Sequence, residues 1–227
     1  ELRAGLLHVA ALALLVVCAR PILAACLRDP ERLGMHDWDS EAAYRAITTV
    51  SLKEYHQFPF WHPYLCGGFP GWAYVGGAPN LVSPFAPFYF LASFPMALRL
   101  ELVGSVVVAL AGTYLLTLRF TKSTAVAVLV AVVAVLNGRF ALQTAAGHMW
   151  HFHYAWQPWA LYFFDRAARG RDGRPGSPLG FAWAGAFLAL MVYTGALYPL
   201  PHTALLLGLY GLGLAVRDRS PRPLLGV

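Results

Sequence analysis

The sequence has little charge and few cysteines. Charged residues make up only 12% of its 227 residues, whereas hydrophobic residues make up 58%. Such a composition is typical of an integral membrane protein and argues against a large soluble domain. The three cysteines form no CxxC motif, so they predict neither a thiolate metal site nor an evident disulfide. The sequence also lacks a Walker loop, GxGxxG, GxSxG and HExxH, which argues against soluble nucleotide chemistry.

The net charge of +6 does not indicate a nucleic-acid partner. Lysines and arginines lie mostly in short loops beside apolar stretches. Basic residues in that position are explained by membrane topology and by contact with anionic lipids. We therefore expect membrane lipids, and no nucleic acid, among the partners of the chain.

Several apolar stretches are long enough to cross the hydrocarbon layer as helices. We predict an all-α fold, a polytopic transmembrane bundle of about six spans that forms one domain over residues 1–227. The first stretch is too long for a signal peptide and lacks a convincing cleavage site, so we expect it to be retained. Because the chain begins with Glu1 and not Met, and stops at Val227 soon after an apolar stretch, we also expect it to be a fragment of a longer protein. The predicted spans are residues 4–27, 97–118, 124–140, 149–164, 179–193 and 198–216.

The charges in the loops predict the orientation of the bundle. With a cytoplasmic N-terminus, most loop arginines, including those of residues 166–174, fall on the cytoplasmic side, as the positive-inside rule requires. The same orientation places every histidine except His8, and most acidic residues, toward the extracytoplasmic side. We therefore expect any chemistry to occur on the extracytoplasmic face.

The longest predicted loop, residues 28–98, lies on the extracytoplasmic side. Within it, residues 40–56 are predicted to form a helix along the membrane surface, with Asp39 or Ser40 as the N-cap. The segment F-P-F-W-H-P-Y-L-C-G-G-F-P follows, with too much proline and glycine for regular structure and too many aromatic rings for a solvated linker. Residues 83–95 are apolar but short and broken by proline, which favours a re-entrant or interfacial segment.

Two carboxylates follow the first predicted span in the sequence Asp37-Trp38-Asp39. In an extended segment, side chains at i and i+2 lie on one side, so the two carboxylates can act together. One interpretation is a general base that deprotonates an attacking hydroxyl, with the second carboxylate orienting a substrate or cation. The other is that Asp39 caps the helix and Asp37 is solvated. If Asp39 is the cap, Asp37 is the better candidate for the base.

A histidine-rich segment, H-M-W-H-F-H, begins at His148. His148 and His151 share one face of a helix, so they can bind a divalent metal ion together with Asp37 or Asp39. This ligand set is incomplete, and histidine and tryptophan also anchor the ends of spans at the membrane surface. A divalent metal ion is therefore one of two interpretations, and no other cofactor is predicted.

The order of these motifs resembles that of a known family. The motifs are the D-W-D exit from the first span, W-H-P-Y before G-G-F-P, S-P-F-A-P-F-Y-F, and A-G-H before W-Q-P. Together they are similar to the N-terminal part of YfhO-type bacterial membrane proteins, and the similarity extends over residues 6–218. YfhO-type proteins belong with the GT-C glycosyltransferases, integral membrane enzymes that take sugars from polyprenyl-phosphate carriers.

This resemblance implies an enzyme of the bacterial cytoplasmic membrane that moves a sugar from a polyprenyl-phosphate donor to a cell-envelope glycan or lipid. It also implies an extracytoplasmic active site on the first loop, with Asp37 or Asp39 as catalytic base. Hydrogen-bond donors or cations are needed to stabilise the departing phosphate. The residues expected to bind substrate are Arg45, Trp61, His62, Tyr64, Arg139 and His148.

Two other functions are compatible with the sequence. A transporter or lipid flippase would use charged residues inside spans, such as Arg20 and Glu101, along its pathway. Inverted repeats, which would favour a transporter, are not evident in the sequence. A non-catalytic membrane assembly protein would keep the fold without the chemistry.

Overall fold

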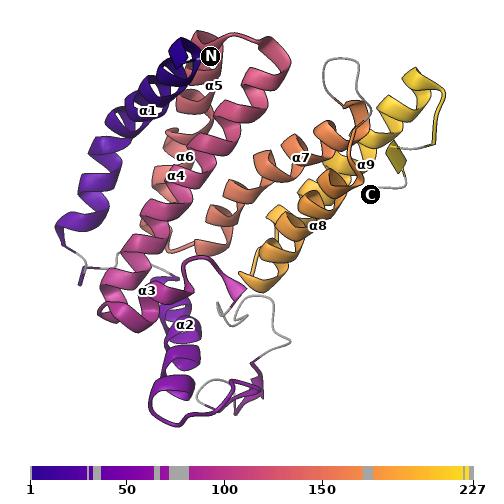
Figure 1. The fold of residues 1–227 in the computed structure, drawn as a ribbon. Helices are drawn as coiled ribbons and strands as arrows, with labels where there is room; N and C mark the ends of the chain where they lie inside the picture. Colours follow the sequence, from indigo (N-terminus) through magenta and orange to yellow (C-terminus); the bar gives the residue numbers. More distant parts are fainter. Residues whose placement is uncertain are drawn as a thin grey trace.

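The computed structural model describes residues 2–29, 31–32, 37–63, 67–71, 82–170, 176–221 and 223–224, and it confirms the predicted all-α class (Figure 1). Two short antiparallel strands, β1 (Trp61–His62) and β2 (Phe69–Pro70), form a hairpin in the first loop. The helices are α1 (Leu2–Arg28), α2 (Trp38–Lys53), α3 (Ala86–Leu91), α4 (Phe94–Thr121), α5 (Thr124–Val135), α6 (Gly138–Ala146), the 3-10 helix η3 (Met149–Trp156), α7 (Gln157–Arg169), α8 (Pro178–Tyr193) and α9 (Pro199–Asp218).

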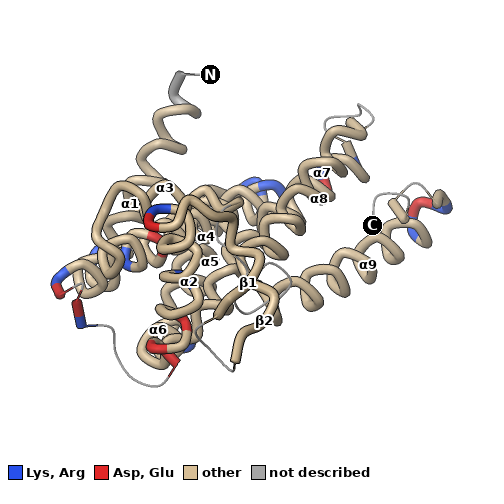
Figure 2. The backbone as a smooth tube through the Cα atoms, turned by 90° about the horizontal axis from the view of Figure 1, so that it is seen from below, with Lys and Arg blue, Asp and Glu red and all other residues tan. Residues whose placement is uncertain are grey.

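Among the residues that the structure describes, four helical segments are long and apolar enough to cross a membrane, which supports the predicted helical membrane bundle. Figure 2 shows long stretches of the helices without Lys, Arg, Asp or Glu. The other two predicted spans differ, because α8 has only 16 residues and the span predicted over residues 149–164 begins as η3 before continuing as α7. The count of six spans therefore stays a prediction. The four candidate spans are Gly5–Arg28, Phe94–Thr121, Thr124–Ala146 and Pro199–Asp218.

The third predicted span is divided into two helices. α5 ends at Val135, and the Asn137 side chain then caps α6 by accepting a hydrogen bond from the Phe140 backbone N–H at 3.1 Å. Asparagine is a favoured N-cap because its side-chain oxygen satisfies a free N–H of the first turn. The helical path therefore continues past Phe140, the predicted end of this span, to Ala146.

The helices pack in two neighbouring groups (Figure 1). In the first, α1, α4 and α5 share a buried apolar cluster that contains Leu15 and Tyr114. In the second, α7, α8 and α9 share a cluster that contains Phe164. α4 joins the groups where Gly112 leaves space for the Trp159 ring of α7, since a Cβ at Gly112 would lie 2.5 Å from Trp159 Nε1. Small residues of this kind allow helices in membranes to approach closely.

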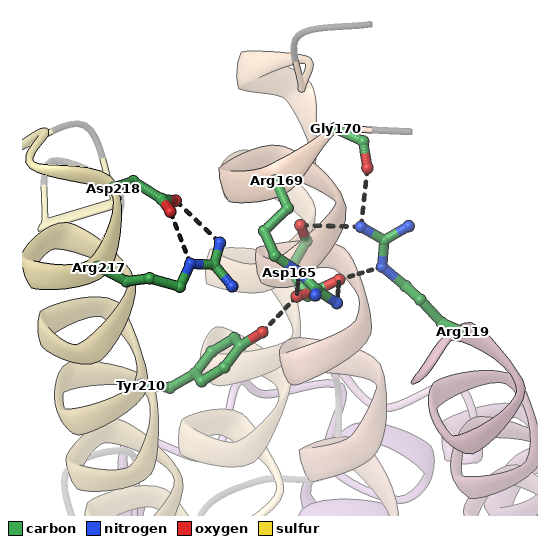
Figure 3. A network of polar contacts seen from close by, with 7 residues as sticks. All are labelled: Arg119, Asp165, Arg169, Gly170, Tyr210, Arg217 and Asp218. Carbon is green, nitrogen blue, oxygen red and sulfur yellow. Dashed lines mark hydrogen bonds and ion pairs between the residues drawn. The ribbon is translucent and has the colours of Figure 1, made fainter. Parts of the chain in front are cut away.

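Asp165 joins three helices at the basic end of the bundle (Figure 3). Arg119 of α4, Arg169 of α7 and Tyr210 of α9 all donate hydrogen bonds to its buried carboxylate. Arg119 also donates to the Gly170 carbonyl at 2.8 Å. Burial alone would raise the pKa of Asp165, but these hydrogen bonds lower it below its usual value. The ionised carboxylate therefore holds the ends of α4, α7 and α9 together.

The first loop contains α2 and the hairpin. α2 (Figure 1) packs beside α3 and α4, where Lys53 lies over the Phe90 ring at 5.6 Å and Arg45 contacts Glu101. Its predicted position along the membrane surface stays a prediction. α2 confirms the predicted helix, although it begins and ends slightly earlier than residues 40–56. Its N-cap is Asp37, so the prediction of Asp39 or Ser40 as the cap is wrong. α3, within residues 83–95, has six residues and is too short to cross a membrane.

Candidate functional site

The N-terminus of α2 docks on the C-terminus of α6. The Asp37 backbone N–H donates to the Ala146 carbonyl at 3.1 Å, and the Trp38 indole N–H donates to the Thr144 carbonyl at 2.8 Å. Gly147 permits this approach, because its φ is +77° and a Cβ there would lie 2.4 Å from the Trp38 nitrogen. These contacts fix the position of Asp37 relative to the segment that follows Gly147.

Asp37 and His148 form a close pair at this junction. Asp37 Oδ2 lies 3.2 Å from His148 Nε2, and both side chains are partly exposed. His148 Nδ1 contacts the Gln143 side-chain oxygen of α6, which orients the imidazole ring. The Asp37 side chain makes no capping hydrogen bond to α2, so its carboxylate remains available to a ligand. A partly exposed carboxylate held by a histidine can act as a general base.

A polar cavity of about 340 Å³ lies next to His148. The Arg139 guanidinium lies over the Tyr154 ring at 5.7 Å, and Tyr154 Oη and His202 Nδ1 form a hydrogen bond of 2.5 Å. An arginine with several imidazoles and phenol groups can bind an anionic group such as a phosphate. The lining residues are Arg139, His148, Trp150, His151, Tyr154, Tyr198 and His202.

A second cavity of about 340 Å³ shares Arg139, His151 and Tyr154 with the first. Its other walls include Ala109 of α4 and Val135 of α5, which lie in candidate spans. The first cavity, lined by basic and aromatic side chains at the predicted outer end of the bundle, thus lies beside a second cavity whose walls include apolar residues of the candidate spans. An amphiphile with an anionic head matches this distribution of side chains.

Four of the predicted site residues come together in this region. Asp37 contacts His148, and His148 lines the polar cavity with Arg139 and His151. Asp39 is solvent-exposed on the first turn of α2. Because the chain is already helical there, side chains two residues apart point in different directions, and the two carboxylates do not form the pair that an extended segment would give.

Arg45 lies in a different environment from the one predicted. Its side chain is buried, with Nη1 2.5 Å from Glu41 Oε2 and Nε 3.3 Å from Glu101 Oε2. Tyr89 also donates a hydrogen bond to Glu101. Burial raises the pKa of Glu41. Burial lowers the pKa of Arg45, but the carboxylates of Glu101 and Glu41 outweigh it and raise that pKa above its usual value. An arginine neutralised in this way does not fit the predicted contact with a phosphate.

The hairpin carries two other residues that were expected to bind substrate. Trp61 is exposed, whereas His62 is only 2% exposed and its ring stacks on Phe69 at 4.5 Å. His62 therefore contributes to the packing of the hairpin. Tyr64, the remaining residue of the predicted set, lies outside the described residues.

The predicted metal ligands do not form a complete site. Within the described ranges, no group of three or more His, Cys, Asp or Glu side chains is placed to hold a metal ion. Asp37 and His148 are close, but the His151 ring centre lies 5.9 Å from that of His148, and Asp39 points elsewhere. Catalytic zinc usually has three protein ligands. Metal dependence therefore stays a prediction, and we derive no step through a metal ion.

Sequence reasoning did not identify Gln143, Tyr154 and Tyr198 as site residues. Gln143 contacts His148, and both tyrosines line the polar cavity. Tyr154 follows His151 by three residues, which places both on one face of a helix and was a usable signal. Gln143 and Tyr198 come from other parts of the chain, and only the packing of the helices brings them to the site.

Comparisons of the chain with protein-family models, with curated proteins and with solved structures found no match. The resemblance to YfhO-type and GT-C proteins therefore remains an expectation from sequence motifs. Inference about function then depends on the geometry of the two cavities and of the Asp37–His148 pair.

Proposed function

We propose that the chain is a GT-C-type membrane glycosyltransferase that moves a sugar from a polyprenyl-phosphate donor to a cell-envelope acceptor at the extracytoplasmic face. The observation that carries this proposal is the position of Asp37. Its carboxylate lies 3.2 Å from His148, which lines a basic cavity, and the neighbouring cavity continues between candidate spans. A base, anion-binding groups and apolar space are thus adjacent, as a lipid-phosphate donor requires.

In the proposed reaction, the acceptor hydroxyl attacks the anomeric carbon of the donor sugar. A bond forms between the acceptor oxygen and this carbon while the bond from the sugar to the lipid phosphate breaks, and the acceptor proton passes to Asp37. His148 holds the carboxylate in position for this transfer. Arg139, His151 and His202 bind the phosphate, on which negative charge develops. The first isoprenoid units of the donor occupy the more apolar cavity.

Sugar transfer in membranes that carry the full-length protein tests this proposal. A radiolabelled lipid-linked sugar serves as the donor. Asp37→Asn should reduce transfer by about 100-fold or more, since a general base contributes roughly 10² to 10⁴ in rate. Arg139→Gln should reduce transfer by about tenfold, because the phosphate loses a charged donor.

Glu54→Gln is the matched control, because Glu54 is an exposed carboxylate at the other end of α2. Transfer by this variant should stay within about twofold of the wild type. Asp39→Asn, tested separately, distinguishes the two carboxylates, and a larger loss there than in Asp37→Asn would assign the base to Asp39. Full transfer by both variants would refute the proposed site. A chelator added to the same assay tests the metal prediction.

A further inference from the structure

We infer that Tyr154 positions the side chains that bind an anion in the polar cavity. Tyr154 is a positioning residue, because it acts through three neighbours to which the proposed function assigns the phosphate, namely Arg139, His151 and His202. The inference rests on that assignment, but it concerns the binding of a phosphate group and no transfer reaction. The inference and the transferase proposal can therefore fail separately.

Tyr154 contacts all three of these residues. The Arg139 guanidinium lies over its ring at 5.7 Å. The His151 ring is stacked on it, with ring centres 6.1 Å apart and planes inclined by 20°. The Tyr154 hydroxyl oxygen forms a hydrogen bond of 2.5 Å with His202 Nδ1. One side chain thus sets the positions of the three groups relative to one another.

These contacts join three elements of the fold. Tyr154 and His151 belong to η3, whereas Arg139 lies in the first turn of α6 and His202 in the first turn of α9. His202 is 48 residues away from Tyr154 in the sequence. Without the hydroxyl of Tyr154, no hydrogen bond between described residues would hold the His202 ring. The contact with α9 therefore depends on one phenol group.

The hydrogen bond to Tyr154 also selects the nitrogen of His202 that can meet a ligand. An imidazole has two ring nitrogens, and Nδ1 is occupied by the Tyr154 hydroxyl. His202 is exposed and lines the polar cavity, so Nε2 is the nitrogen that remains for a ligand. When the phenol donates to Nδ1, Nε2 carries the hydrogen and can donate to an anion.

The stack on Tyr154 orders Arg139 before a ligand binds. Arginine has a long side chain that loses much conformational entropy when it is fixed in place. Arg139 is exposed, and its guanidinium forms no ion pair with a carboxylate of the described residues. Its contact with the Tyr154 ring restricts it beforehand, so less entropy is lost when an anion binds.

Charge indicates the class of ligand. None of the described residues that line the polar cavity is acidic. Arg139 is always protonated, and the imidazoles add N–H donors beside it. A phosphate group matches a permanent cation that is surrounded by such donors. The same chemistry is offered by inorganic phosphate and by a lipid phosphate, so the test includes a probe of each kind.

Calorimetric titration of the full chain in nanodiscs tests the inference. The probes are inorganic phosphate and geranyl phosphate, with geraniol as the uncharged control and empty nanodiscs as the blank. We expect at least one of the two phosphates to bind with a Kd of about 1 mM or lower, and geraniol to bind about tenfold more weakly or not at all. Binding of both phosphates means that the phosphate group suffices, whereas binding of geranyl phosphate alone means that the site takes a lipid phosphate.

Two substitutions separate the hydroxyl of Tyr154 from its ring. Tyr154→Phe keeps the stack with Arg139 but loses the hydrogen bond to His202, so we expect the Kd to rise about fivefold. Tyr154→Leu loses both contacts and should raise the Kd about 20-fold. Tyr162→Phe is the matched control, because Arg166 lies over the Tyr162 ring at 5.6 Å and Tyr162 lines neither cavity. Its Kd should stay within about twofold of the wild type.

A double-mutant cycle distinguishes positioning from direct binding and from support of the fold. In a His202→Ala background the Tyr154 hydroxyl has no imidazole to hold, so Tyr154→Phe should change the Kd by less than about twofold. A hydroxyl that bound phosphate directly would weaken binding equally in both backgrounds. The thermal unfolding midpoint of Tyr154→Phe should stay within about 2 °C of the wild type, whereas a residue that only supported the fold would lower it further.

Three results would overturn the inference. The first is that neither phosphate binds, the second is that geraniol binds as tightly as geranyl phosphate, and the third is that Tyr154→Phe has the same effect with and without His202. The sugar-transfer assay judges the transferase proposal separately. Phosphate binding that follows these expectations in a protein without transfer would support the role of Tyr154 and refute the proposed function.

Discussion

Asp37 is the N-cap residue of α2 through its backbone, whereas its side chain contacts His148. Its place between the first span and α2 gives it the N-cap position of that helix. Its side chain makes no capping hydrogen bond and contacts His148 at 3.2 Å. The sequence had assigned the cap to Asp39 or Ser40 and the base to Asp37. A carboxylate that is not needed to satisfy the first turn remains available to accept a proton.

Asp165→Ala tests the polar contacts at the basic end of the bundle. The substitution leaves the Arg119 guanidinium and the Tyr210 hydroxyl without their buried acceptor, so we expect the free energy of unfolding to fall by about 3 kcal/mol. Reversible unfolding in mixed detergent micelles measures this change. Asp218→Ala is the control, because its carboxylate pairs with Arg217 at the exposed surface and should matter little. Equal losses in the two variants would contradict a special role for Asp165.

Glu41 predicts a dependence of stability on pH. Burial raises its pKa by more than Arg45 lowers it. A carboxyl group whose folded pKa is raised favours the fold most below its unfolded value of 4.5, and this contribution declines as pH rises through the folded pKa. Glu41→Gln removes the ionisation. Between about pH 4 and pH 7, its free energy of unfolding should therefore decline less than that of the wild type. If the free energy of unfolding changed with pH equally in Glu41→Gln and the wild type, groups other than Glu41 would control the pH dependence of stability.

Arg45 shows which contacts sequence patterns miss at the residue scale. Its pairing with Glu41 follows the i, i+4 spacing of a helix and was predictable from the sequence. Its contact with Glu101, 56 residues away, depends on how α2 packs against α4. That packing buries Arg45 and removes it from the predicted phosphate-binding set. Local spacing contains no information about such a contact.

At the scale of elements, the junction of α2 with α6 is open to a direct test. Gly147→Ala places a Cβ 2.4 Å from the Trp38 nitrogen at a φ of +77°, so we expect the free energy of unfolding to fall by about 2 kcal/mol. The same change should separate Asp37 from His148 and lower sugar transfer. Unfolding in mixed micelles and the transfer assay measure the two effects.

Gly138→Ala is the matched control for this junction. Gly138 begins α6, and a Cβ there would meet nothing within 4 Å. Because alanine favours helix more than glycine does, this variant should be as stable as the wild type or slightly more stable. If Gly147→Ala behaved in the same way, the close contact between α2 and α6 would not matter for stability.

Sequence patterns predicted the long helices better than their interruptions. α1 and α4 lie close to the predicted spans, because the thickness of the hydrocarbon layer requires about 20 apolar residues. The break between α5 and α6 was missed, although Asn137-Gly138 is a turn signal. The 3-10 helix η3 was also missed. It has eight residues, which is longer than most 3-10 helices, and no pattern in residues 149–156 distinguishes it from an α-helix.

At the scale of the whole molecule, the predicted orientation can be tested by labelling. In a variant whose native cysteines are replaced by serine, Glu54→Cys and Thr121→Cys place single thiols at exposed positions on α2 and at the end of α4. A membrane-impermeant maleimide added to intact cells should label Glu54→Cys and not Thr121→Cys. Both should react once the membranes are opened. Labelling of Thr121→Cys alone in intact cells would mean the opposite orientation.

The cavities belong to the whole molecule and were beyond the sequence. Loop charges predicted that Arg139, His148 and His202 share one side of the membrane. The sequence did not predict that α6, η3 and α9 bring these side chains around one cavity. The side of the membrane on which a residue lies follows from the order of the spans. The distances between residues on that side depend on which helices are neighbours.

The hydrogen bond between Trp38 and Thr144 joins residues 106 positions apart. Ribosomes add roughly 5 to 20 residues per second, so α2 is synthesised roughly 5 to 20 seconds before the helix on which it docks. During that interval Asp37 has no histidine partner, and the Trp38 ring has no acceptor. A nascent chain that stops before residue 148 thus contains the whole first loop but lacks the histidine that contacts Asp37. The junction of α2 with α6 therefore forms only after α6 and His148 have been synthesised.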